Sequence, residues 1–168
     1  KIVFIALFFG LVQSLFCQTW QLQWQNCFGG SDDDEAYDII PTSGGYLVAG
    51  ATMSTDGDVS YNHGGDDGWL MAIDKTGALK WEKTYGGSLG EGIFRIFPTS
   101  DSCFYLLCVS CSSDGDISTD PYPNTCDYWV VKVDSTGAIL WEKILGGNGL
   151  DQPTDGCITT DGGIVVIG

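Results

Sequence analysis

The sequence predicts an all-β protein made of four-stranded antiparallel sheets, and three observations support this fold class. The first is a tandem repeat: WQNCFGG at 24–30 returns as WEKTYGG at 81–87 and as WEKILGG at 141–147. The second is that each unit holds four short runs rich in Ile, Val, Tyr and Trp, bounded by turn residues. The third is that no stretch after the N-terminal segment shows the apolar spacing of three and four residues that is typical of a helix.

The repeat sets the organisation of the chain. Trp24, Trp81 and Trp141 are separated by 57 and then 60 residues. A fixed period of this size is typical of units that stack or are arranged around an axis. We expect repeat units at 24–80, 81–140 and 141–168, the last one truncated, with the remaining units in a longer chain.

Each expected strand follows from local composition. In the first unit the β-rich runs cover 35–42, 46–52, 68–74 and 79–85. Glycine-containing turns separate them at 43–45 and 75–77, because glycine adopts positive φ without steric cost. Asp74 and its counterpart Asp134 precede such turns, where a carboxylate can accept backbone N–H groups.

Four-stranded sheets repeated around an axis form a β-propeller, here an incomplete arc of about two and a half blades. A β-solenoid has shorter repeats, and tandem sandwiches have longer units with independent cores. Recurring tryptophans favour the propeller, since their rings can pack between thin sheets; a sugar-stacking role is the alternative. The tryptophans expected to dock blades are Trp24, Trp81, Trp141, Trp69 and Trp129.

The N-terminal segment is typical of a secretory signal. Residues 2–16 are almost wholly apolar, follow Lys1, and are too few to span a bilayer. Cleavage after Cys17 would give a signal peptide at 1–17 and a partial propeller at 18–168; lipidation of Cys17 is the alternative. The chain begins without Met and ends inside the third unit, as a fragment of a longer reading frame would. We expect the protein to be secreted or on the outer cell surface.

Charge and cysteine content narrow the functional classes. A formal net charge of −15 argues against binding nucleic acid or an anionic membrane surface. Cys108 and Cys111 have metal-like spacing, but no second pair completes a zinc site. Because export places cysteines in an oxidising setting, we expect small buried cysteines and one disulfide within the second unit.

One motif resembles a known family. The run Asp74-x-x-Gly77-x-x-x-Trp81 returns at 134–141 and resembles the tryptophan docking motif of quinoprotein-type propellers. The whole unit is similar to repeats of large exported β-propeller proteins of Bacteroidota, which often carry a type IX secretion signal. The resemblance implies an uncharacterised surface or secreted protein. The second unit departs from the pattern at 101–103 and at 121–126.

Strand alternation predicts an acidic loop face. In a four-stranded meander, the link between units lies at the same end as the link between the second and third strands. In the first unit these links are 29–34 and 53–67, whereas the opposite end holds only short turns. Binding residues concentrate on such loops. The tentative ligand-binding residues are Asp32, Asp33, Asp34, His63, Asp66 and Asp67.

Alternating oxygen side chains in two loops suggest a calcium site. Hard cations need six to eight oxygens, which alternating acids can supply in part. The EF-hand pattern is incomplete, and the alternative is that Asp and Gly shape and solvate the turn. The candidate calcium ligands are Asp56, Asp58, Ser60, Asn62, Asp114, Asp116, Ser118 and Asp120.

No catalytic pattern stands out, and the chain is more typical of a non-enzymatic module that binds an extracellular glycan or protein. The alternatives are a quinoprotein-like oxidoreductase, a glycan-cleaving hydrolase, and a purely structural spacer. Asp34, Glu91 and Asp151 recur at the entry to each inner strand, where capping of the first N–H groups or contact with a substrate would suit them.

The segment 22–28 corresponds to a fourth strand without its preceding three, so we expect an open arc with an exposed apolar flank.

Overall fold

The computed structural model describes residues 21–168 and consists of ten strands joined by turns and loops. The expected signal segment at 1–17, with its cleavage point after Cys17, lies outside the described residues. The first four strands are β1 (Asp34–Thr42), β2 (Gly45–Thr52), β3 (Asp67–Asp74) and β4 (Leu79–Tyr85). The next four are β5 (Glu91–Pro98), β6 (Phe104–Ser110), β7 (Asp127–Val133) and β8 (Ile139–Leu145). The last two are β9 (Asp155–Ile158) and β10 (Ile164–Ile167).

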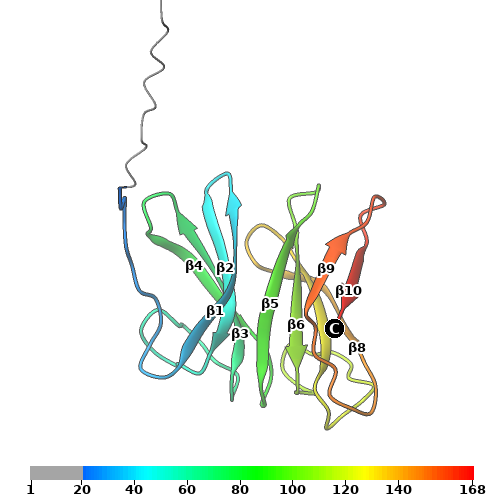
Figure 1. Cartoon of the computed structure of the whole chain (residues 1–168). Coiled ribbons are helices and arrows are strands. Elements are labelled where there is room, and N and C mark those ends of the chain that lie inside the picture. The colour runs from blue at the N-terminus through cyan, green and yellow to red at the C-terminus, as the bar shows by residue number, and fades with distance from the viewer. Residues whose placement is uncertain (1–20) are drawn as a thin grey trace, which may run out of the picture.

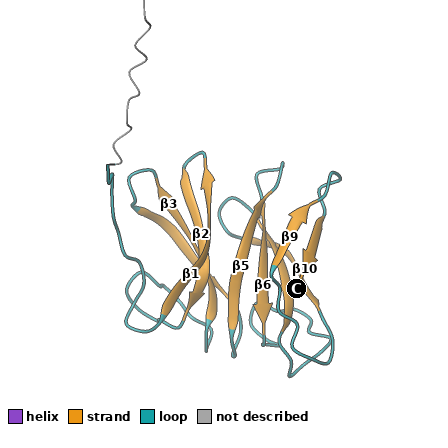
Figure 2. Ribbon diagram, viewed as in Figure 1, coloured by secondary structure: helices purple, strands orange, loops and turns teal. Residues whose placement is uncertain are grey.

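The strands form two four-stranded sheets and one hairpin, all antiparallel and in chain order. The first sheet is β1-β2-β3-β4, the second is β5-β6-β7-β8, and β9 pairs with β10. Figure 1 shows them side by side, and Figure 2 shows that strands and loops make up the whole described part. The expected all-β class and the four-stranded sheets are confirmed, and no helix occurs between residues 21 and 168.

The tight turns form for the reason that the sequence predicts. Asp74 Oδ1 accepts the N–H of Thr76 at 2.8 Å and the N–H of Ala78 at 3.0 Å. Gly77 follows with φ of 86°, a value that favours glycine. Asp134 makes the same contacts one unit later. The predicted carboxylate-capped turns are therefore confirmed.

The core lies between the sheets rather than inside any one of them. One apolar cluster joins the first and second sheets through Leu70, Tyr85, Ile93, Leu106 and Trp129, all buried. The Tyr85 hydroxyl, at the end of β4, donates to the Gly137 carbonyl of the second sheet at 2.7 Å. Each sheet is one strand thick, so it excludes water from its apolar faces only by packing against a neighbour.

The first strands of the two sheets, β1 and β5, contact each other directly. β1 has a bulge at Tyr37 and β5 has one at Phe94, and the two rings stack with centroids 5.1 Å apart. Asp38 Oδ2 also accepts the backbone N–H of Ile96 at 2.8 Å. The bulges re-aim both aromatic side chains along one side of the paired sheets.

The segment 22–28 differs from the prediction of a strand, because it forms none. Its side chains nevertheless pack on the first sheet: Phe28 contacts a cluster that contains Trp69, and the Trp24 ring lies 6.2 Å from that of Tyr46. The Asn26 amide donates to the Gly77 carbonyl. Thus 24–28 lies on the first sheet much as β4 lies on the second. It is not a strand because no backbone ladder partner for it exists within 21–168.

The six cysteines within residues 21–168 comprise one disulfide and four free thiols. Cys111, just after β6, is bonded to Cys126, just before β7, which confirms the prediction of a disulfide within the second unit. Cys108 is buried in the core, as expected for a small apolar side chain. The same expectation is wrong for Cys27 and Cys157, which are exposed on the first segment and on β9.

Candidate functional site

The long connections gather at one end of the sheets, which we call the loop face. Met53 donates its backbone N–H to the Asp33 carbonyl at 2.9 Å, and Asp58 donates to the Gly29 carbonyl at 3.0 Å. The link that precedes β1 and the loop between β2 and β3 therefore run side by side. The short turns between β1 and β2 and between β3 and β4 lie at the other end, the turn face (Figure 1). The predicted sharing of one face by the long links is confirmed.

The aspartates of the first loop hold it to this preceding link. Asp56 Oδ1 accepts the N–H of Ser31 at 2.7 Å, and Asp58 Oδ2 accepts that of Gly29 at 3.1 Å. Gly57 between them has φ of 67° and packs on the Gly29 carbonyl so closely that a Cβ would collide with it. Through these hydrogen bonds, the two carboxylates hold the loop after β2 against the link that precedes β1.

The second unit makes the same hydrogen bonds at the equivalent residues. Asp114 Oδ1 accepts the N–H of Ser88 at 2.8 Å, and Asp116 Oδ2 accepts that of Gly86 at 3.2 Å. The N–H bonds to Asp114 hold the pKa of this carboxyl below its usual range. A repeated set of hydrogen bonds on one surface shows that this half of each loop is part of the scaffold.

The other candidate calcium ligands also bind protein groups. Ser60 and Ser118 donate to Glu82 and Glu142, Asn62 donates to the Thr52 carbonyl at 3.0 Å, and Asp120 accepts the Tyr122 N–H. Within residues 21–168 no three His, Cys, Asp or Glu side chains are placed to hold one metal ion. The hydrogen bonds of these side chains are those expected of the turn-shaping alternative.

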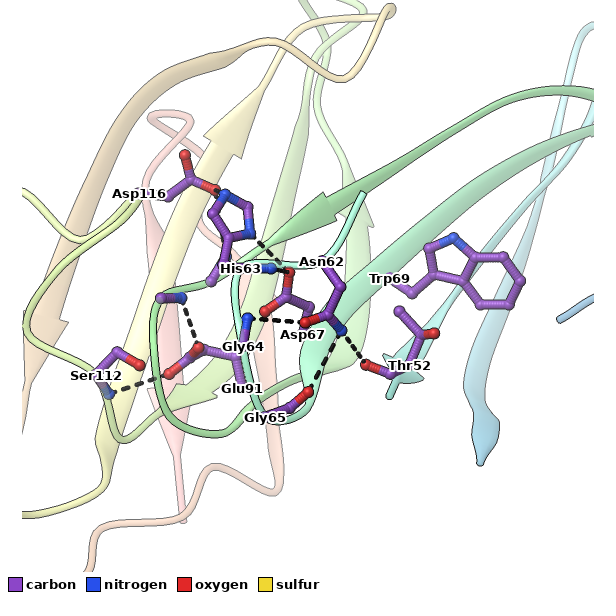
Figure 3. A network of polar contacts seen from close by, with 12 residues as sticks. Thr52, Asn62, His63, Gly64, Gly65, Asp67, Trp69, Glu91, Ser112 and Asp116 are labelled. Carbon is purple, nitrogen blue, oxygen red and sulfur yellow. Dashed lines mark hydrogen bonds and ion pairs between the residues drawn. The ribbon is translucent and has the colours of Figure 1, made fainter. Parts of the chain in front are cut away.

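A network around His63 lies at the junction of the two sheets (Figure 3). His63 Nδ1 lies 2.6 Å from Asp67 Oδ2, which also accepts the His63 backbone N–H at 2.8 Å. His63 Nε2 lies 3.7 Å from Asp116 Oδ2 in the second unit. One imidazole thus faces carboxylates of both units.

Asp67 is a buried member of this network with one carboxylate oxygen that lacks a hydrogen-bond partner within residues 21–168. Its side chain is fully buried, and its Oδ1 has no hydrogen-bond partner among the described residues. Burial raises the pKa of Asp67, the hydrogen bonds from His63 oppose that shift, and the charge of Glu91 adds to it. Asp67 Oδ1 and Glu91 Oε2 each lie 2.6 Å from the point where a Cβ on Gly86 would sit. Two buried carboxylates therefore face the same glycine.

The recurring acids at the inner strands have a different role from the predicted capping of the first inner-strand N–H groups. Asp34 Oδ2 accepts the N–H of Gly30 at 2.7 Å, and Glu91 Oε2 accepts that of Gly87 at 2.8 Å. Glu91 Oε1 also accepts the N–H of Ser112 at 3.0 Å. Asp34 and Glu91 thus each hold the second glycine of the pair that precedes β1 or β5, and Glu91 also holds the loop after β6.

The predicted ligand residues separate into two groups. Asp32, Asp33 and Asp66 are exposed on the loop face, whereas Asp34, His63 and Asp67 are wholly or partly buried in the hydrogen-bond network. The proximity of His63 to Asp116 was missed. No sequence signal indicates it, because it depends on how the loops of two units meet in space.

The end of the loop differs between the units. In the second unit Thr125 donates to Asp127 Oδ2 at 2.8 Å, where the first unit has His63 on Asp67. The Gly147 N–H donates to Asp127 Oδ1 at 3.1 Å, so both oxygens of this aspartate have partners. The disulfide of Cys126 adds a covalent bond that the first unit lacks. The residues just before the third strand are therefore specific to each unit.

The five predicted docking tryptophans occupy three settings. Trp69 and Trp129 are buried within the sheets, and Trp24 and Trp81 are half-buried at the sheet interfaces. Trp141 is exposed and lies beside Tyr105, with centroids 5.5 Å apart.

The polar partners of the His63 imidazole bear on the chemistry that this residue could perform. A base oriented by a carboxylate can activate a nucleophile only within hydrogen-bond reach. Among the described residues, the imidazole of His63 has polar contacts with the carboxylates of Asp67 and Asp116. Neither group is a hydroxyl or a thiol that the imidazole could deprotonate.

Comparison with protein-family models and with curated proteins finds no match to this chain. Within 21–168, no helix is long and apolar enough to cross a membrane.

Proposed function

We propose that this chain is a secreted or cell-surface β-propeller repeat protein whose loop face binds an extracellular glycan or protein. The observation that supports it best is the division of each long loop into two parts. The first part makes the same hydrogen bonds in both units, and the second part differs in sequence and contacts. In repeat proteins, insertions specific to single units map to one face, which is often the binding face.

The propeller arrangement is supported by how neighbouring sheets contact one another. β4 ends with Tyr85 bonded to the turn of the second sheet, and 24–28 packs on the first sheet in the corresponding place. The outer segment of each unit thus covers the face of the next sheet, as a closed ring of sheets requires. This arrangement also agrees with the resemblance to exported propeller repeats.

Export is supported by the disulfide and by the apolar segment at 2–16. Disulfides persist in oxidising environments such as the cell exterior and the bacterial periplasm. Cys111 and Cys126 join two parts of a loop at the loop face. A covalent tie there fixes the loop for contact with a partner, because a pre-organised surface loses less entropy on binding.

The residues best placed to contact a ligand are exposed and lie in the unit-specific part of the first loop. Tyr61 has 59% of its surface exposed and meets His63 edge-on, with centroids 4.7 Å apart. Tyrosine supplies a large contact area at low entropic cost and is enriched at interfaces. Asp66, at the entry to β3, is also exposed.

The test is binding of the full chain to arrays of glycans and of extracellular proteins, with calcium and then with a chelator. We expect binding that survives chelation, and about a tenfold loss in the double variant Tyr61→Ala/Asp66→Ala. Lys75→Ala on the turn face is the matched control and should bind as the parent chain does. Failure to bind either array, or equal binding by the double variant, would overturn the proposal.

A further inference from the structure

A cavity of about 410 Å³ opens between the first and second sheets at the turn face. The first sheet contributes β2, β3, β4 and the end of β1 with the turn after it. The second sheet contributes the end of β5, the turn and strand that follow it, and the turn between β7 and β8. It lies at the opposite end of the sheets from the loop face. We call it the interface cavity. Its volume is within the range of sites that enclose small organic ligands.

Aromatic side chains form much of its wall. Tyr46 and Trp81 line it from the first sheet, and Phe104 lines it from the second. All three are half-buried, so each ring presents a surface to the cavity without being free in solvent. Leu47 and Ile73, both buried, complete the apolar floor.

The rim is polar and, unlike most of this acidic molecule, carries no negatively charged side chain among the described residues. The chain has 22 acidic residues, yet no Asp or Glu lines the cavity, and Lys80 is its charged lining residue. The hydroxyl of Thr99 is used within its own turn, where it donates to the Cys103 carbonyl at 2.8 Å. Within the described chain, no protein hydrogen bond involves the other lining hydroxyls, which are those of Thr42, Ser43, Ser102 and Ser135.

The interface between the second sheet and the β9–β10 hairpin provides a comparison for the interface cavity. Ala72 pairs with Leu47 and with Trp81 across the first sheet. Its counterpart in the second sheet is Lys132, which pairs with Tyr105 and Trp141.

Lys132 changes the character of the second interface. Its Nζ lies 2.8 Å from Asp101 Oδ2 and 5.5 Å from the centre of the Tyr105 ring. The hollow there, of about 440 Å³, is lined mainly by polar residues, Asp161 among them. The small Ala72 is therefore what leaves the floor of the interface cavity apolar and open.

We propose that the interface cavity binds a single pyranose ring of a neutral saccharide. A pyranose has apolar C–H faces, which suit aromatic walls, and hydroxyl edges, which suit a rim of unpaired hydroxyls. A neutral ligand fits better than an anionic one, because the negative field of the molecule repels anions. The site goes beyond the proposed binding at the loop face and does not depend on it.

The experiment is titration of the full chain with methyl glycosides of glucose, galactose, mannose and N-acetylglucosamine, followed by calorimetry and tryptophan fluorescence. We expect at least one to bind with a Kd of about 1 mM or tighter and to change the fluorescence. Ala72→Lys places in the cavity the side chain that the second sheet has at the same position. It should weaken binding by about tenfold or more. Lys132→Ala at the other interface is the matched control and should not change the affinity.

A second variant protects the test against misfolding. If Ala72→Lys lowers the melting temperature, the double variant Ser102→Ala/Ser135→Ala at the rim replaces it, with the same expected loss. The site is overturned if none of the four glycosides binds. It is also overturned if Ala72→Lys and Ser102→Ala/Ser135→Ala both bind the glycoside as tightly as the parent chain does. Tighter binding of a methyl glucuronide than of the neutral glycosides overturns the ligand class. Tyr61→Ala/Asp66→Ala leaves this binding unchanged, which separates the outcome from that at the loop face.

Discussion

The indole nitrogen of Trp69, in β3, donates a 2.9 Å hydrogen bond to Glu82 Oε2 in the neighbouring strand β4. The other oxygen of Glu82 accepts the hydroxyl of Ser60, in the loop before β3. Trp129 and Glu142 repeat the bond at the same 2.9 Å in the second sheet. One carboxylate thus joins a buried tryptophan to the scaffold part of each long loop.

We expect Glu82→Ala to lower the free energy of unfolding by about 2 kcal/mol, because the nearly fully buried indole N–H of Trp69 would lose its acceptor. Glu82→Gln should cost less, since its amide oxygen can still accept that bond. Urea unfolding followed by fluorescence measures both changes. Lys75→Ala, exposed at a turn, is the control and should stay within about 0.5 kcal/mol of the parent. An equal cost for Ala and Gln would contradict the role of the hydrogen bond.

A second prediction concerns the unpaired oxygen of Asp67. We expect Asp67→Asn to raise the free energy of unfolding at neutral pH by about 1 kcal/mol, since an amide N–H at this position can donate to Glu91. The matched variant is Asp127→Asn in the second sheet. Both oxygens of Asp127 already accept hydrogen bonds, so that change should destabilise the protein. Denaturant unfolding at pH 7 compares the two, and a loss of stability in both would contradict the argument.

The same residue predicts a pH dependence. Burial raises the pKa of Asp67 above its usual value, so the folded state holds this proton more tightly than the unfolded state. Its ionisation therefore lowers stability as the pH rises through the window between the ordinary and the raised pKa. The stability gained by Asp67→Asn should be largest at neutral pH and shrink as the pH falls through that window. Unfolding curves from pH 7 down to about 4 test this, and a constant difference would contradict it.

The sequence was sufficient to predict features that depend on local pattern. The strands of the first sheet begin and end within one residue of the expected bounds. The turns at Asp74 and Gly77 follow because a carboxylate cap and positive φ act within four residues. The face shared by the long links was predictable because antiparallel strands alternate in direction.

Features that depend on contacts between units were not predictable in the same way. Neither the approach of His63 to Asp116 nor the partner choice of Cys111 follows from periodicity, since both depend on how two loops meet. The segment 22–28 has the sequence of a strand, but a strand requires a backbone partner that 21–168 does not supply. Packing of Phe28 on the first sheet survives without that partner because apolar burial is not directional.

The disulfide provides a further prediction. Reduction, or the double variant Cys111→Ser/Cys126→Ser, should lower the free energy of unfolding by about 3 kcal/mol, because the bond closes a loop of 15 residues in the unfolded chain. Thermal unfolding with and without reductant measures the effect. Cys27→Ser removes an exposed free thiol and is the control, with no change expected. Equal melting temperatures for oxidised and reduced protein would contradict the stabilising role.

The hairpin β9–β10 predicts self-association. Val165 and Ile167 on β10 are 49% and 60% exposed, and β10 pairs with β9 alone among the described strands. An apolar edge with unpaired backbone groups is a template for adding another strand. We expect a polypeptide limited to residues 21–168 to associate with increasing concentration, and Val165→Lys/Ile167→Lys to suppress this by charge repulsion, as sedimentation velocity can measure. Leu89→Lys on the loop face is the control and should associate as the parent does. A parent that stays monomeric at all concentrations would contradict the prediction.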